Sequence, residues 1–179
     1  RLTPQKGIDL IQKVVPELLR HLSFSLVVLG SGEARFERFY SWLQDSFPGR
    51  VSFYRGYSEK LAHTIEAGAD MFLMPSLYEP CGLNQMYSLR YGTVPIVRQT
   101  GGLADSVQLY DPITRKGDGI VFQHYNDEGL RWAIVTALDL YADRPAWRRM
   151  MQNGMAKNFS WDTQGQQYVD LFRRLSRKD

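Results

Sequence analysis

The sequence lacks three features: paired cysteines, long apolar runs and an excess of charge of one sign. Its 179 residues include a single cysteine, Cys81, which excludes an internal disulfide and a cysteine-rich metal site. The 22 basic and 19 acidic residues nearly balance. No basic stripe with interleaved aromatic residues is present, so we expect no nucleic-acid partner. No apolar run approaches the roughly 18–20 residues of a membrane span, so we expect no membrane partner either.

What the sequence does contain is enough apolar material for one folded domain. Hydrophobic residues make up 44% of the chain and aromatic residues 13%, which argues against disorder. The length suits a single domain of roughly 100–200 residues, and we find no internal repeat, linker or low-complexity tract. The sequence therefore predicts one domain over residues 1–179, in which residues 159–179 form a helical tail.

Apolar residues change their spacing repeatedly along the chain. Steps of three and four residues indicate amphipathic helices, and short β-rich runs indicate strands. Helices are predicted over residues 4–21, 33–45, 58–67 and 82–91, and strands over residues 23–29, 51–54, 70–75, 93–97 and 119–122, before a helical C-terminal part. Strands that alternate with helices through short turns are typical of an α/β domain with a parallel sheet flanked by helices.

Ligands of open parallel sheets bind where the strands end and the next helices begin. Three segments with unusual residues fall there: residues 1–7 (RLTPQKG), 76–87 (SLYEPCGLNQMY) and 98–103 (RQTGGL). Taken singly, each has an ordinary explanation, with glycines for tight turns, Glu79 as a capping carboxylate and Lys6 as a charge on a helix surface. Because all three are expected at one edge of the sheet, a ligand site becomes the better interpretation.

The middle segment combines an anion site with a carboxylate. The helix predicted there would present the free N–H groups of Gly82, Leu83 and Asn84 to a ligand, and its dipole favours an anion. Glu79 would repel a phosphate, but it could accept hydrogen bonds from neighbouring hydroxyl groups. This combination favours a diphosphate joined to a sugar.

The other two segments supply further groups for an anionic ligand. Arg1 and Lys6 offer counter-charges for phosphates, and the arginine could bind them in a bidentate manner. Thr100, Gly101 and Gly102 would present a second patch of bare backbone at the same edge. From the residues alone, the sequence predicts an anionic, hydroxyl-rich ligand.

The segments 1–7, 79–87 and 100–105 also carry a family resemblance. Together with residues 91–95 (YGTVP), 118–122 (DGIVF) and 159–162 (FSWD), they closely resemble the C-terminal domain of bacterial glycogen synthases and plant starch synthases. The resemblance runs essentially from end to end. It implies the C-terminal half of a GT-B glycosyltransferase, in which two Rossmann-like domains hold the active site in the cleft between them.

The resemblance further implies a reaction. Members of this family extend an α-1,4-glucan from ADP-glucose, or in some cases from UDP-glucose, with retention at the anomeric carbon and without a metal or cofactor. They work in the bacterial cytoplasm or in plastids. The glucan acceptor would bind through an N-terminal domain to which nothing in this sequence corresponds, so the chain alone is expected to be inactive.

Position by position, the resemblance assigns roles to residues of this chain. Arg1 and Lys6 would hold the donor diphosphate, Glu79 would bind the glucosyl group, and these three form the expected catalytic set. Tyr57 would stack on the nucleotide base. Related retaining transferases carry a second glutamate where this chain has Tyr87, so the ribose contacts stay unassigned. The donor pocket would further be lined by Cys81, Gly82, Leu83, Thr100, Gly101 and Gly102.

Two other functions are compatible with parts of the sequence. A nicotinamide-dependent oxidoreductase is suggested by Gly30 and Gly32 after a strand, but Arg35 stands where the dinucleotide fingerprint requires a third glycine, and the next strand does not end in an acidic residue. A non-catalytic glucan- or nucleotide-binding regulatory module is the stronger alternative. In such a module the catalytic site would have lost its functional residues. The presence of Arg1, Lys6 and Glu79 argues against that loss.

Overall fold

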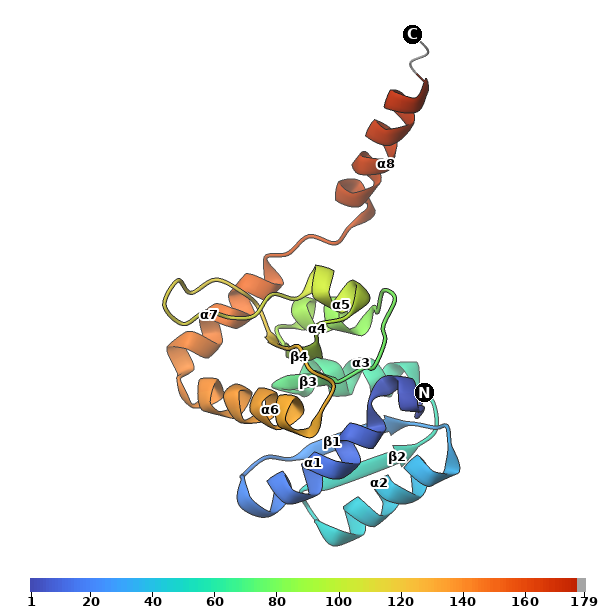
Figure 1. The fold of residues 1–179 in the computed structure, drawn as a ribbon, viewed down its shortest axis with the longest axis vertical. Coiled ribbons are helices and arrows are strands. Elements are labelled where there is room, and N and C mark those ends of the chain that lie inside the picture. Colours follow the sequence, from blue (N-terminus) through green and yellow to red (C-terminus); the bar gives the residue numbers. More distant parts are fainter. Residues whose placement is uncertain (177–179) are drawn as a thin grey trace.

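The fold is a layered α/β arrangement of parallel strands and helices, seen in a computed structural model that describes residues 1–176 (Figure 1). Residues 177–179 of the predicted tail lie outside the described residues. The strands are β1 (Leu26–Gly30), β2 (Val51–Arg55), β3 (Met71–Met74), β4 (Val94–Arg98) and β5 (Ile120–Phe122). All strand pairs are parallel, which confirms the predicted fold class.

The strands form two separate ladders, although the sequence suggested one sheet. β1 pairs with β2, and β3, β4 and β5 pair in that order. The N-terminal segment is fastened to both ladders. Leu2 N–H donates to Ser31 O after β1, and Leu77 N–H after β3 donates to Gln5 O, each at 2.9 Å. This segment therefore brings its own side chains to the edge where both ladders end.

The helices lie close to the predicted positions. They are η1 (Pro4–Lys6, a 3₁₀ turn), α1 (Ile8–His21), α2 (Ala34–Ser46), α3 (Glu59–Gly68), α4 (Asn84–Tyr91), α5 (Gly101–Ser106), α6 (Asp127–Ala142), α7 (Arg144–Met155) and α8 (Trp161–Ser176). The predicted N-cap at Ser58 is confirmed, because its Oγ accepts from Leu61 N–H at 3.2 Å.

Two glycines explain why helices start later than the sequence suggested. Gly7, with φ of +73°, interrupts the helix predicted over residues 4–21, and a Cβ at this position would collide with Pro75 O. Gly82 has a φ of +74°, so the helix predicted from residue 82 begins at Asn84 instead. Both glycines lie at the edge where the predicted site residues gather.

Two further boundaries were not predicted. The segment 100–102 opens the short helix α5 instead of a loop. The helical C-terminal part breaks between α6 and α7 at Asp143, whose carboxylate caps α7 by accepting from Ala146 N–H at 3.1 Å. Pro145 at the start of α7 cannot continue a preceding helix, which explains the break.

Two apolar clusters hold these layers together. The larger one joins α1, α2, α6 and α7 to the strands. The smaller one lies among β3, α4, β4 and α5 and consists of Met74, Leu89, Val97, Leu103 and Val107, each at most 7% exposed. Full burial of such a side chain stabilises by roughly 1.5–3 kcal/mol. The smaller cluster thus fixes the four elements around the loop that carries Glu79.

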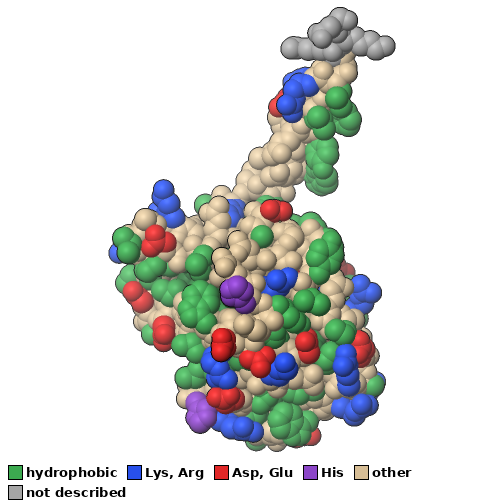
Figure 2. Space-filling view, viewed as in Figure 1, with side chains coloured by type: hydrophobic (Ala, Val, Ile, Leu, Met, Phe, Trp, Pro, Cys, Tyr) green, Lys and Arg blue, Asp and Glu red, His purple; other side chains and the backbone are tan. Residues whose placement is uncertain are grey.

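Helix α8 stands away from the body of the domain (Figure 1). None of its described residues is buried. Apolar side chains show along one side of it in Figure 2. Its exposed residues include Trp161, Tyr168, Phe172 and Leu175. This helix occupies most of the predicted tail.

Candidate functional site

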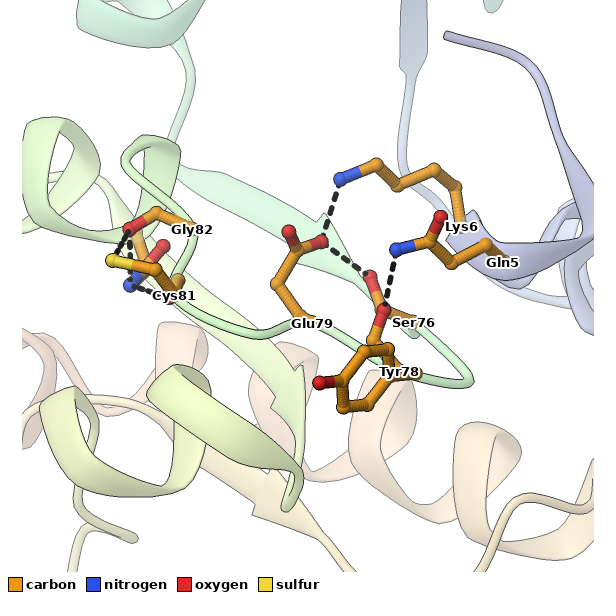
Figure 3. Close-up of polar contacts among 8 residues, drawn as sticks. Gln5, Lys6, Ser76, Tyr78, Glu79, Cys81 and Gly82 are labelled. Carbon is orange, nitrogen blue, oxygen red and sulfur yellow. Dashed lines mark hydrogen bonds and ion pairs between the residues drawn. The ribbon is translucent and has the colours of Figure 1, made fainter.

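The loop between β3 and α4 carries a buried carboxylate. Glu79 is 7% exposed, and its Oε2 accepts from Lys6 Nζ at 2.5 Å and from Ser76 Oγ at 3.2 Å (Figure 3). Within residues 1–176, no donor reaches its second oxygen, Oε1. One oxygen is therefore fixed by the protein, and the other can accept a hydrogen bond from a ligand.

Lys6 reaches Glu79 because the N-terminal segment docks on this loop. Gly7 N–H closes the 3₁₀ turn by donating to Pro4 O at 2.9 Å, and Gln5 Nε2 donates to Tyr78 O at 3.0 Å. The Lys6 side chain remains 35% exposed. Its ammonium has three hydrogens, so it can hold Glu79 and still donate to an anion.

Arg1 lies at the same edge but contacts no other predicted residue through its side chain in the described structure. Its neighbour Leu2 bridges to Gly32, and Glu33 N–H donates to Leu2 O at 2.9 Å. The structure thus joins Lys6 to Glu79, and the place of Arg1 in the catalytic set stays a prediction.

Gly101 and Gly102 allow two loops to pack backbone against backbone. A Cβ at Gly101 would collide with Glu79 O, and one at Gly102 would collide with Cys81 O. Gly102 N–H donates to Glu79 O and to Pro80 O, both at 3.1 Å. The prediction of bare backbone at Gly102 was therefore wrong, because its amide is used to hold the Glu79 loop. A ligand contact by Thr100 or Gly101 stays a prediction.

A run of unpaired backbone amides leads into α4. Within residues 1–176, the N–H groups of residues 81–85 donate no hydrogen bond. Cys81 is exposed, Leu83 is 54% exposed, and the first helical residue is Asn84. Unpaired N–H groups at a helix start are a ready-made anion site. Gly82, Leu83 and Asn84 therefore offer the free amides that the sequence predicted.

Two tyrosines flank this edge. Tyr57, after β2, is 83% exposed, so a face of its ring is free, although no contact joins it to the other predicted residues. Tyr87 on α4 is 41% exposed and packs against His63 of α3, with ring centroids 5.5 Å apart. Tyr57 follows the β1–β2 ladder and the Glu79 loop follows β3 of the other ladder, so a shared role in one site stays a prediction.

Residues that the sequence did not single out complete the loop. Arg98 ends β4 and donates through Nε to Ser76 O at 2.8 Å, and Gln85 of α4 donates to Cys81 O and Gly82 O at 3.0 Å each. Both lie inside segments marked as unusual, but their side chains act on backbone atoms. Nothing in residue type or spacing reveals such a role.

Beneath α4 lies another buried carboxylate, Glu66, which is 2% exposed. Burial raises the pKa of Glu66, and hydrogen bonds from Ser88 and Asn84 offset this only in part. Ser88 Oγ donates to Glu66 Oε1 at 2.7 Å. Glu66 therefore holds α4 through Ser88 and accepts no hydrogen bond from the unpaired amides of residues 81–85.

The candidate site is an open edge. Two surface hollows of about 500 and 620 Å³ lie elsewhere, against α1 and α6 and against α2 and β2, and the predicted residues line neither. Among residues 1–176 there is no group of His, Cys, Asp and Glu that could hold a metal ion, and no helix is long and apolar enough to cross a membrane.

Comparison with known proteins decides the family. The sequence pattern of the family described as glycosyl transferases group 1 matches residues 1–155, which is most of the chain. The chain belongs to the glycosyl transferases of group 1. Among group 1 relatives, it is 50% identical over 174 residues to the glycogen synthase of Koribacter versatilis and 46% identical over 179 residues to that of Geobacillus thermodenitrificans.

These group 1 relatives are much longer than the chain. The match covers 97% of this chain and 36% of the Koribacter protein, and 100% and 37% for the Geobacillus protein. A solved structure gives the same picture. The catalytic domain of starch synthase IV from Arabidopsis thaliana, bound to ADP and acarbose, matches with a TM-score of 0.85 and 36% identity, over 97% of this chain and 36% of that one. The chain therefore has the fold of one Rossmann-like domain of a GT-B glycosyltransferase.

Proposed function

We propose that the chain is the donor-binding, C-terminal domain of a retaining glucosyltransferase that extends α-1,4-glucan from ADP-glucose in the bacterial cytoplasm. Two findings support this proposal: the relatives are bacterial glycogen synthases, and the starch synthase structure is named as bound to ADP and acarbose. Since the chain spans about a third of those proteins, the acceptor glucan is assigned to the remainder of the full-length protein.

The observation that carries the proposal is that Lys6 pairs with Glu79 in the same loop whose amides, at residues 81–85, donate no hydrogen bond within residues 1–176. A diphosphate would accept hydrogen bonds from two kinds of donor there, the backbone N–H groups at the start of α4 and the ammonium of Lys6. Arg1 is assigned as a second cation for the diphosphate. Glu79 Oε1, to which no donor in residues 1–176 reaches, would accept from a sugar hydroxyl. An anion and a sugar thus find complementary groups side by side.

These groups suit the departure of a nucleoside diphosphate. The bond between the anomeric carbon and the diphosphate oxygen breaks, and its electron pair leaves with the diphosphate. Lys6, Arg1 and the unpaired amides stabilise the negative charge that grows on that oxygen, while the Glu79 carboxylate favours the positive charge that grows on the sugar. The acceptor hydroxyl forms the new bond to the anomeric carbon and loses its proton to the leaving diphosphate.

The nucleotide base is assigned to Tyr57. An aromatic ring that is 83% exposed can stack on either purine or pyrimidine, so this contact does not by itself choose between ADP-glucose and UDP-glucose. ADP-glucose is preferred in the proposal because of the starch synthase relative. We assign UDP-glucose as the second donor to be tested.

The test uses the purified full-length protein and radiolabelled donors. We expect transfer of glucose from ADP-glucose to glycogen, with weaker transfer from UDP-glucose and release of ADP in equal amount. Transfer from UDP-glucose alone would change the donor. Absence of transfer from both donors, together with ADP binding to the protein, would favour the regulatory module. The chain alone should bind ADP but transfer no glucose.

A further inference from the structure

In the backbone of residues 76–83, the carbonyl groups are hydrogen-bonded and most N–H groups are not. Every carbonyl oxygen in this stretch accepts a hydrogen bond from the protein. The N–H groups of Tyr78, Glu79, Cys81, Gly82 and Leu83 have no acceptor within residues 1–176. A loop usually pairs both kinds of group with protein or water. Here the protein pairs the acceptors, and these donors stay unpaired within residues 1–176.

The side chains that hold the carbonyls come from outside this stretch. Arg98 donates to Ser76 O through Nε and to Leu77 O through Nη2, and Gln85 Nε2 lies 3.0 Å from both Cys81 O and Gly82 O. A planar guanidinium holds two carbonyls in a fixed relation, which a single ammonium cannot do.

The Gln85 side chain is buried and makes a further hydrogen bond. Its side chain is 1% exposed, and its Nε2 also donates to Ser106 Oγ at 3.0 Å. Ser106 Oγ in turn donates to Gly102 O at 2.5 Å, which ties the amide to the start of α5. The Gln85 Oε1 atom is buried without a partner. The unsatisfied Oε1 acceptor costs roughly 1–3 kcal/mol of folding free energy, while the Nε2 atom of the same amide donates to the carbonyls of the loop.

We propose that Gln85 and Arg98 are positioning residues that hold the carbonyls of residues 76–82 inward and so aim the loop's N–H groups at the donor. The inference rests on the proposed function, in which those N–H groups bind the diphosphate and the glucosyl group. Neither side chain touches the ligand. Their effect is to fix donors that would otherwise have to reorganise as charge develops.

The chain offers a matched control for each residue. Asn153 Nδ2 donates to two loop carbonyls, Arg115 O at 2.9 Å and Gly117 O at 2.7 Å, just as Gln85 does in its own loop. The Arg50 guanidinium donates to Leu19 O at 2.7 Å and Leu22 O at 2.6 Å, as Arg98 does near the site. Both controls hold loops that carry none of the predicted site residues.

The test compares Gln85→Met with Asn153→Leu and Arg98→Lys with Arg50→Lys in the full-length protein. We expect Gln85→Met and Arg98→Lys to lower kcat by about 10-fold or more, with less than about threefold change in the Kd of ADP, because preorganised donors act mainly on the transition state. The controls should lower Tm by similar amounts and leave kcat within about twofold of wild type. A kcat loss in the controls equal to that in the site variants would overturn the inference.

A second readout does not depend on the reaction. Chymotrypsin can cut beside the exposed Leu77, Tyr78 and Leu83. We expect Gln85→Met to speed cleavage between residues 77 and 84 several-fold under native conditions, while Asn153→Leu leaves that cleavage unchanged. Unchanged cleavage in Gln85→Met would contradict the holding role even if the wild type transferred no glucose. An inactive wild type would instead count against the proposed function.

Discussion

The loop of residues 108–119 and the loop of residues 76–83 are built from similar parts. In the first, Lys157 pairs with the Asp118 carboxylate, whose side chain is 3% exposed, and the Asn153 amide donates to two carbonyls. Both carboxylate oxygens are engaged, since Oδ1 accepts from a backbone N–H at 3.0 Å. The backbone N–H groups of the loop pair largely within it. This loop is closed on itself.

The loop of residues 76–83 has the same lysine–carboxylate pair and the same kind of amide. Lys6 pairs with Glu79, and Gln85 donates to two carbonyls. However, one oxygen of Glu79 and a row of backbone N–H groups remain unpaired within residues 1–176. In the proposed function these unpaired groups are the ones that bind the donor. The two loops thus differ in how the carboxylate is paired, with both oxygens of Asp118 and one oxygen of Glu79 held by the described protein.

The largest expected effect is on kcat, and it should distinguish Glu79 from Asp118. Glu79→Gln in the full-length enzyme should lower kcat by about 100-fold or more, because the charge that supports the reacting sugar is lost. The Kd of ADP should change little, or improve slightly as Lys6 is released from its partner. Steady-state kinetics and calorimetry measure both quantities. A kcat near wild type would make Glu79 a structural residue like Asp118.

The opposite pattern is expected for Asp118→Asn. Removal of the charge leaves Lys157 partly buried beside a neutral amide, so the free energy of unfolding should fall by about 1–3 kcal/mol. The kcat of the folded enzyme should stay within about threefold of wild type. Chemical denaturation and kinetics on one preparation test this. A 100-fold loss of kcat without a loss of stability would contradict the claim that Asp118 is structural and Glu79 functional.

A smaller effect is expected on ADP binding when Lys6 loses its charge. Lys6→Met should weaken ADP binding about 10-fold, which corresponds to roughly 1.4 kcal/mol, and should flatten its dependence on salt. Lys13→Met is a suitable control, because Lys13 is exposed and pairs loosely with Asp127 at 3.6 Å. Titrations of ADP at low and high ionic strength provide the measurement. Equal effects of the two substitutions would show that Lys6 acts only through overall charge.

The smallest expected effect is on Glu66, the buried carboxylate below α4. Burial raises the pKa of Glu66 in the folded chain, so its ionised form opposes folding. Glu66→Gln should therefore raise Tm by roughly 2–4 °C at pH 7. The gain should vanish below about pH 4, where the carboxyl is protonated in the folded and unfolded chains alike. A loss of stability at pH 7 would mean that the ionised group is favoured by its partners.

The sequence predicted the strands and most helices because their apolar spacing reports burial directly. It also placed Arg1, Lys6 and Glu79 at one edge, since the ends of parallel strands and the starts of helices must meet there. The break at Gly7 was missed because it depends on a backbone contact with Pro75, which is distant in sequence. For the same reason the use of Gly102 N–H by the neighbouring loop could not be foreseen.

The roles of Gln85 and Arg98 show a further limit of sequence reasoning. Both side chains act on carbonyl groups, and every residue has one, so no motif marks the acceptor. The break between α6 and α7 at Asp143 is different, because its capping carboxylate and the proline that follows could have been recognised.

The most direct test is an ADP titration of the ¹⁵N-labelled chain followed by NMR of its backbone amides. The account predicts that the amides of residues 81–85 shift together, with a Kd in the high micromolar to millimolar range because half a cleft leaves the nucleotide exposed. Raised salt should weaken the binding. The amides of residues 108–119 should stay in place. Shifts confined to residues 108–119, or absent from residues 81–85 at saturating ADP, would contradict the claim that the open loop is the binding loop.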